Sequence, residues 1–165
     1  MKSAYIGIIG LVLGTATPAL AEIKIGDRAA DFEKQGTLGQ TVKMSAMQGK
    51  VVLVDFWASW CEPCKKELPI LGKIAPRLRA RGIEIVTINV DESKSNAMEF
   101  IRAHQLQQLT TVLDSDKSLV GKYEPPSMPT SFVVDKSGIV RALNAGFEVG
   151  DEAKIEKQLA NLANK

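Results

Sequence analysis

The sequence predicts an α/β protein whose mixed sheet is covered by helices on both faces. Apolar runs over 51–57 (VVLVDFW) and 83–90 (IEIVTINV) are typical of strands buried on both faces, and a stretch with helical spacing of apolar residues follows each. Two further strands are expected over 130–134 and 139–144, joined by four residues that include a glycine. Such a link predicts a hairpin, so the sheet should contain strands of both orientations.

The residues before the first buried strand are expected to form a short N-terminal extension. Within 23–48, a turn at Gly36–Gly39 is followed by a short strand over 40–44, which indicates a β-hairpin. Ser45 is positioned to cap a helical turn that ends at Gly49.

Helices are predicted where apolar residues recur every three or four positions. They are expected over 61–81, which Gly82 ends, after a capping Ser93 or Ser95, and from a capping Asp151 onward. Two shorter elements lie between them, a strand over 110–113 and a helix over 116–122.

Length and composition favour one ordinary globular domain. The chain has 165 residues, of which 45% are hydrophobic and 24% charged, and this length suits one domain with a real core. The formal net charge is only +2 and no run of five basic residues occurs, so we expect no nucleic-acid partner. We expect a monomer, because no spare length remains for a dimerising domain.

The first residues have the pattern of a signal peptide. Lys2 precedes an apolar stretch over 4–13, and the small residues TATPALA end in an A-x-A cleavage pattern before Glu22. We therefore expect cleavage before Glu22 and export to the periplasm. The alternative is an uncleaved membrane anchor, but the strongly apolar core is shorter than the ~20 residues that span a bilayer. The predicted division is a signal peptide over 1–21 and one domain over 22–165.

The chemistry of the protein is expected at its only two cysteines, Cys61 and Cys64. A structural bridge between them would close almost no loop and stabilise little. If the helix begins near Cys61, unpaired N–H groups and the helix dipole lower the pKa of its thiol, and Pro63 suits the first turn. Cys64 then lies one turn later and deeper. This arrangement predicts that Cys61 attacks a substrate disulfide and Cys64 resolves the mixed disulfide.

Other uses of this pair are conceivable. A zinc site needs four ligands, but the chain has one cysteine pair and one histidine. A purely structural bridge and a pair that has lost catalysis are further alternatives. A copper(I) delivery module could use the same two thiolates, because copper(I) prefers soft ligands. We expect no metal and no cofactor in the redox reaction.

The stretch 54–65 (VDFWASWCEPCK) resembles the active-site motif of thioredoxin. With CEPCKKE and the preceding segment, the chain is similar to the exported TlpA/ResA-like thiol-disulfide reductases, which are related to those of cytochrome c maturation. The likeness extends over most of 25–162. It implies a thioredoxin-like fold with a central mixed sheet, flanking helices and an N-terminal β-hairpin extension. It also implies clients that are oxidised exported proteins, such as apocytochrome c or copper-assembly factors, and a DsbD/CcdA-type membrane thiol transporter as electron donor.

The resemblance assigns substrate contacts on both sides of the cysteines. It implies that Pro129 is a cis-proline opposite the cysteines, with Met128 and Thr130 flanking it and Met128 pairing with substrate through its backbone. The alternative is an ordinary proline-containing loop. We also expect substrate contacts from Trp60 and from the two residues between the cysteines, Glu62 and Pro63.

Two carboxylates are candidates for proton transfer. Asp55 interrupts a buried apolar run, so desolvation should raise its pKa and allow it to exchange a proton with Cys64. The resemblance supports this role for Asp55 and implies that Glu67 belongs to the site and influences the thiols. The alternatives are a hydrated Asp55 at a strand end and a solvated Glu67. Where thioredoxin has a lysine on the next strand, this chain has Thr87.

We expect the protein to act as a reductant. The negative charge of Glu62 beside Cys61 disfavours the thiolate, and a destabilised thiolate makes a weaker oxidant. Lys65 and Lys66 oppose this effect, but as exposed charges they are screened. An oxidase or isomerase of the same fold is the alternative. A peroxiredoxin-like peroxidase shares a similar N-terminal segment but lacks the W-C-x-x-C pair.

Overall fold

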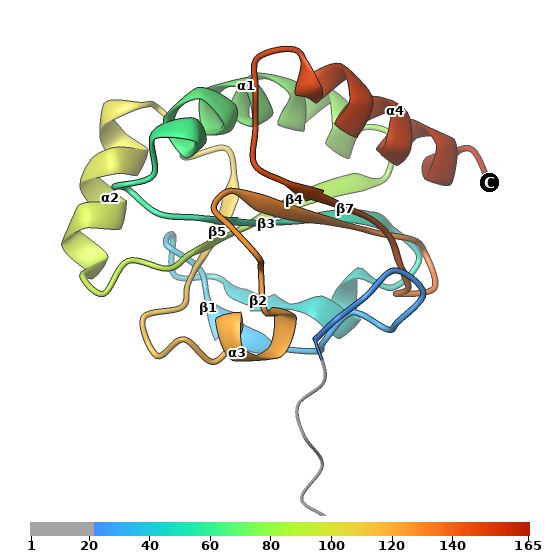
Figure 1. Cartoon of the computed structure of the whole chain (residues 1–165), viewed down its shortest axis with the longest axis horizontal. Coiled ribbons are helices and arrows are strands. Elements are labelled where there is room, and N and C mark those ends of the chain that lie inside the picture. Colours follow the sequence, from blue (N-terminus) through green and yellow to red (C-terminus); the bar gives the residue numbers. More distant parts are fainter. Residues whose placement is uncertain (1–21) are drawn as a thin grey trace, which may run out of the picture.

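A five-stranded mixed sheet forms the centre of the protein, shown in Figure 1 as a computed structural model. The structure describes residues 22–165, so the predicted signal peptide and its cleavage site lie outside the described residues. The elements are β1 (Glu33–Gln35), β2 (Thr41–Lys43), a 3-10 helix (Met44–Met47), β3 (Val51–Trp57), α1 (Glu62–Arg79), β4 (Ile83–Asn89), α2 (Lys94–Ala103), β5 (Thr110–Leu113), α3 (Val120–Tyr123), β6 (Thr130–Val134), β7 (Val140–Ala145) and α4 (Asp151–Ala163).

The strand order is β5-β4-β3-β6-β7. β3, β4 and β5 run parallel, whereas β6 is antiparallel to β3 and β7 is antiparallel to β6. β1 and β2 form a separate antiparallel hairpin. The predicted mixed sheet, the C-terminal hairpin and the N-terminal β-hairpin extension are therefore confirmed. Helices α1 and α4 cover one face of the sheet, while α3 and the β1–β2 hairpin cover the other (Figure 1).

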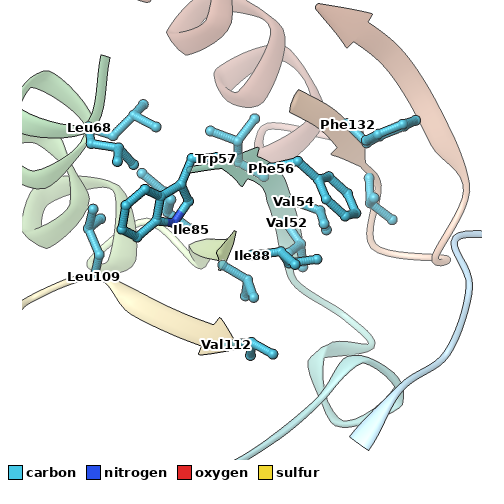
Figure 2. Close-up of a cluster of buried hydrophobic side chains, with 14 of the residues drawn as sticks. Val52, Val54, Phe56, Trp57, Leu68, Ile85, Ile88, Leu109, Val112 and Phe132 are labelled. Atoms are coloured by element: carbon cyan, nitrogen blue, oxygen red, sulfur yellow. The ribbon is translucent and has the colours of Figure 1, made fainter. Parts of the chain in front are cut away.

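Strand β3 lies in the middle of the sheet, and all seven of its residues are buried. Successive side chains point to opposite faces. Figure 2 shows Trp57 beside Leu68 of α1 on one face and Phe56 beside Phe132 on the other. The rings of Phe56, Phe132 and Tyr123 form a cluster. The ring centroids are 5.9 Å apart for Phe56 and Phe132, 5.3 Å for Phe56 and Tyr123, and 5.1 Å for Tyr123 and Phe132. The end of β3, from which the cysteine loop departs, is therefore held from both sides.

Two predictions about short helices are wrong: the capping residue of the 3-10 helix and the first residue of α3. Ser45 lies inside the 3-10 helix, and the residue at its N-cap position is Lys43. The short helix predicted over 116–122 begins only at Val120. Lys117 has a left-handed φ of 56°, which a helix cannot contain, and the Asp114 carboxylate accepts the N–H of Val120 at 2.9 Å.

The start of the last helix also differs from the prediction. Gly150, with a φ of 112°, takes the N-cap position of α4, and Asp151 is the first helical residue. The Asp151 carboxylate accepts the N–H of Glu148 at 2.9 Å, so it stabilises the loop before the helix rather than capping the helix. Ser93 does hold the N-cap position of α2, but its side chain makes no cap hydrogen bond.

Replacing Phe132 with alanine should lower the free energy of unfolding by about 3–5 kcal/mol, because the change leaves a cavity in the aromatic cluster. Urea unfolding of the oxidised protein measures this value. Val149→Ala is the control, because Val149 is 73% exposed and its truncation should stay within about 0.5 kcal/mol. Equal effects of the two substitutions would contradict the packing described here.

Candidate active site

The two cysteines lie at the start of α1, as predicted. After β3 the chain turns tightly, with the Cys61 N–H bonded to the carbonyl of Ala58 at 3.1 Å. Cys61 is the N-cap residue of α1, and its Sγ accepts the N–H of Cys64 at 3.2 Å. A disulfide joins Cys61 to Cys64, and Pro63 lies in the first turn of the helix. An unpaired helix N–H thus points at the sulfur that should carry negative charge after reduction.

The two sulfurs differ in their access to water. Cys61 is 4% exposed and Cys64 is completely buried. Cys61 is therefore the outer member of the pair, as predicted, but in this oxidised form only a small edge of it meets solvent, less than the sequence indicates. The neighbouring Trp60 is 66% exposed and stands at the surface beside the disulfide.

The Met128–Pro129 bond is cis, as the resemblance implies. Thr130 pairs with Phe56 across the strands, which places Pro129 at the end of the sheet where the cysteine loop leaves β3. The carbonyl of Pro129 accepts the N–H of Gly146 at 2.8 Å, whereas the backbone of Met128 has no hydrogen-bond partner within residues 22–165. Thr130 is completely buried, and its side chain donates to the carbonyl of Ser127 at 2.7 Å. Its backbone lies in β6 between β3 and β7, opposite Phe56 and Ala145.

Asp55 lies inside the protein and not at a hydrated strand end, so that alternative is wrong. Its side chain is completely buried, and neither carboxylate oxygen has a hydrogen-bond partner within the described part of the chain. Burial raises the pKa of Asp55 well above its usual value, and the nearby carboxylate of Glu67 adds to the rise. Thr87 is its neighbour on β4, as predicted, and Ser131 is its neighbour on β6.

Glu67 is also buried, although it belongs to a helix. It is 2% exposed, and its Oε2 atom has no hydrogen-bond partner among residues 22–165. Burial raises the pKa of Glu67 to about 8, and the negative charge of Asp151 at the start of α4 contributes. The alternative of a solvated surface glutamate is therefore wrong. The structure brings Asp55 and Glu67 together beneath the cysteine helix, on the face covered by α1 and α4.

Glu62 lies at the surface between the cysteines, and Lys65 forms an ion pair with it. Both side chains are partly or fully exposed, so this pair is weak and screened. It nevertheless places a positive charge beside the negative one, so the effect of Glu62 on the thiolate is smaller than the sequence alone suggests.

A row of polar side chains, not predicted from the sequence, crosses the sheet at the level of Asp55. The row joins equivalent register positions on all five strands: Thr111, Thr87, Asp55, Ser131 and Asn144. At one end the hydroxyls of Thr87 and Thr111 bond at 2.8 Å, and at the other end Asn144 exchanges hydrogen bonds with Gln158 of α4. Each of these five polar residues was visible in the sequence, but their alignment depends on the register of the strands.

The metal alternatives depend on the ligands that the described residues bring together. Within residues 22–165, no group of three or more histidine, cysteine, aspartate or glutamate side chains could hold a metal ion. A copper(I) module would therefore have to rely on the cysteine pair itself. No helix in the described part of the chain is long and apolar enough to cross a membrane.

Comparisons with known proteins show the family to which the chain belongs. The family model described as "AhpC/TSA family" matches residues 25–143. The thiol-disulfide oxidoreductase ResA of Bacillus cereus is 30% identical over 119 residues, which are 72% of this chain and 68% of that protein. This chain thus spans about two thirds of that relative.

Solved structures show the same relationship. A candidate thiol:disulfide interchange protein DsbE of Chlorobium tepidum has a TM-score of 0.81 and 33% identity, covering 86% of this chain and 99% of that one. The exposed lipoprotein thioredoxin of Streptococcus pneumoniae has a TM-score of 0.69 and 28% identity, covering 78% and 98%.

The fold and the paired cysteines at a helix start define a thiol-disulfide oxidoreductase with a thioredoxin-like fold. The chain belongs to the AhpC/TSA family and, within the thioredoxin-fold proteins, is of the ResA type.

The buried Glu67 should make the stability of the oxidised protein fall as the pH rises. The folded protein keeps the Glu67 proton up to about pH 8, whereas the unfolded chain loses it near the usual value of 4.5. Between these values the folded state binds more protons, so the free energy of unfolding decreases with pH. We expect a loss on the order of 3 kcal/mol from about pH 5 to about pH 8.

Urea unfolding at several pH values tests this expectation. Glu67→Gln should flatten the decline and make the protein more stable than the wild type near pH 8. Glu99→Gln, at an exposed position of α2, is the control and should keep the wild-type slope. An unchanged slope in Glu67→Gln would show that Glu67 is ionised in the folded protein.

Proposed function

We propose that this protein is exported and reduces disulfides of other exported proteins through Cys61 and Cys64. The observation that supports the proposal most is the position of Cys61 as the N-cap of α1, with its sulfur accepting the N–H of Cys64. This arrangement stabilises a thiolate on the outer sulfur and keeps the inner sulfur completely buried behind it.

The reaction is a two-step exchange that conserves electrons and protons. The Cys61 thiolate attacks one sulfur of the client disulfide, forms a mixed disulfide and releases the other client sulfur as a thiolate that takes up a proton. Cys64 then loses its proton and attacks the Sγ of Cys61. The second client thiol leaves, and the Cys61–Cys64 disulfide present in the structure is the oxidised product.

Asp55 and Glu67 are the groups that would take the Cys64 proton. A general base works best when its pKa lies near the operating pH, and burial raises the pKa of Glu67 to about 8. Asp55 lies deeper on β3 and has no hydrogen-bond partner within residues 22–165 to hold it in one protonation state. Both carboxyls therefore suit a role in receiving and returning protons during exchange.

The client would bind between the cysteine loop and the cis-proline. The free backbone of Met128 can pair with an extended client segment, and the exposed Trp60 can cover its side chains. Glu62 and Pro63 directly follow Cys61 in the chain, and Glu62 is exposed while Pro63 is half-buried, so both can contact a client bound at the Cys61 sulfur. An extended client strand that pairs through its backbone makes the site tolerant of client sequence.

Export is supported by the apolar N-terminal stretch and by the likeness to the exposed lipoprotein thioredoxin of Streptococcus pneumoniae. In the periplasm the oxidised product needs an electron donor, for which a membrane thiol transporter of the DsbD/CcdA type is suited. Apocytochrome c and copper-assembly factors are the clients that the TlpA/ResA-like resemblance favours. The peroxiredoxin-like peroxidase alternative is not favoured by membership of the AhpC/TSA family, because both cysteines of this chain form one closely spaced pair.

The variant Cys64→Ser should accumulate mixed disulfides between Cys61 and its clients, because the resolving thiol is missing. The covalent complexes can be isolated from cells and identified by mass spectrometry. Cys61→Ser is the matched control and should capture at least about tenfold less, since Cys64 is completely buried. Equal capture by both variants would contradict the assigned order of attack.

The reduction potential of the Cys61–Cys64 pair should lie nearer to that of thioredoxin, about −270 mV, than to that of DsbA, about −120 mV. Glu62 disfavours the thiolate and Lys65 only partly offsets it, so the reduced form gains little stability. Equilibration with glutathione or dithiothreitol buffers measures the potential. A value above about −170 mV would indicate an oxidase instead.

A further inference from the structure

Asp91 lies just after β4 and contacts the loop that carries the cysteines. It is only 4% exposed. One of its carboxylate oxygens accepts the hydroxyl of Ser59 at 3.1 Å, and the two oxygens accept the Ser59 N–H at 3.2 and 3.1 Å. Asn89 donates a further bond to the same carboxylate at 2.8 Å and accepts the N–H of Asp91 at 3.1 Å. The carboxylate is therefore fully engaged, and most of its bonds go to the cysteine loop.

Ser59 occupies the second position of the turn that delivers Cys61 to the helix. The N–H of Cys61 closes this turn on the carbonyl of Ala58, and Cys61 immediately caps α1. One residue before the turn, the carbonyl of Trp57 accepts the N–H of Val90 at 2.9 Å. The turn is thus bonded along one side to the residues that follow β4, and Asp91 supplies the bonds closest to the cysteine.

The segment that holds Asp91 is itself fixed. Lys117, from the loop after β5, donates to the carbonyl of Val90. The carbonyl of Asn89 accepts the N–H of Asp114 at 2.8 Å. Asp91 therefore connects a rigid part of the sheet to the turn, and it can define the position of the turn rather than follow its movement.

We propose that Asp91 is a positioning residue for disulfide exchange: its carboxylate holds the Ala58–Cys61 turn and thereby places the Cys61 sulfur against the N–H of Cys64. The inference rests on the proposed role of Cys61 as the attacking thiol. Loss of these bonds would let the turn shift, and the sulfur would lose the helix N–H that stabilises its thiolate. An amide oxygen at position 91 can still accept the Ser59 N–H and hydroxyl, which hold the turn, although the amide nitrogen can no longer accept from Asn89.

The charge of Asp91 must be separated from its geometry. A negative charge near Cys61 raises the pKa of the thiol, so removal of the charge alone lowers it. The other titratable groups around the loop include Lys117 beside Val90, the exposed Glu92, the Glu62–Lys65 pair at the start of α1, and the buried carboxyls of Asp55 and Glu67. All of these are unchanged in variants of Asp91.

The test measures the pKa of Cys61 in the reduced protein from the pH dependence of iodoacetamide alkylation, with the modified residue identified by mass spectrometry. Asp91→Ala should raise this pKa by about one unit and slow reduction of insulin disulfides by about tenfold or more. Asp91→Asn should leave the pKa unchanged or lower it by about half a unit, and keep the exchange rate within about threefold. Glu92→Gln, an exposed neighbour, is the control for loss of a nearby charge and should match the wild type.

The alternatives give different patterns. If Asp91 acted only through its charge, both Asp91 variants would lower the pKa, and if it acted only in folding, neither would change it. Either pattern overturns the inference. If Asp91→Ala does not fold, Ser59→Ala removes the hydroxyl that donates to Asp91. This variant should raise the pKa of Cys61 by about a third of a unit. No rise in Ser59→Ala also overturns the inference. Failure of wild-type Cys61 to react at any pH would instead contradict the proposed function.

Discussion

The chemistry of this protein depends on the short turn that joins the buried strand β3 to helix α1. Because β3 lies between β4 and β6 and is buried on both faces, its end cannot move independently of the sheet. The turn Ala58–Cys61 then allows one geometry, in which Cys61 caps the helix and its sulfur meets a backbone N–H. A helix start supplies both an unpaired donor and a favourable dipole, so ordinary backbone groups provide the stabilisation of the thiolate.

The second constraint is the pair of carboxyls beneath this turn. Apolar side chains of similar size at Asp55 and Glu67 would pack without the desolvation penalty, so both residues reduce stability when ionised. Groups with strongly shifted pKa values that are clustered beside a reactive pair indicate a functional site. From Asp55 the polar row continues through Ser131 to Asn144, so this layer of the sheet carries neutral hydroxyl and amide groups.

Local patterns predicted most of the fold, because strand runs, helical spacing and the hairpin are encoded in neighbouring residues. The cysteine spacing and the position of Cys61 at the helix start followed from the same local signals. The errors concern the starts of helices, where several local conformations suit the same residues: Lys117 adopts a left-handed conformation, and Asp151 bonds to Glu148, three positions earlier, instead of capping α4. The contact of Asp91 with Ser59 and the near-complete burial of Cys61 also depend on how separate loops meet, which one sequence does not encode locally.

The most direct test of this account is titration of the Cys61 thiol in the reduced wild-type protein, followed by the ultraviolet absorbance of the thiolate or by alkylation. A sulfur that receives a helix N–H and faces the positive end of the dipole should ionise well below the value of about 8.5 for an ordinary cysteine. A thiol that is still protonated above about pH 9 would contradict the account, because the backbone would then provide no stabilisation of the anion.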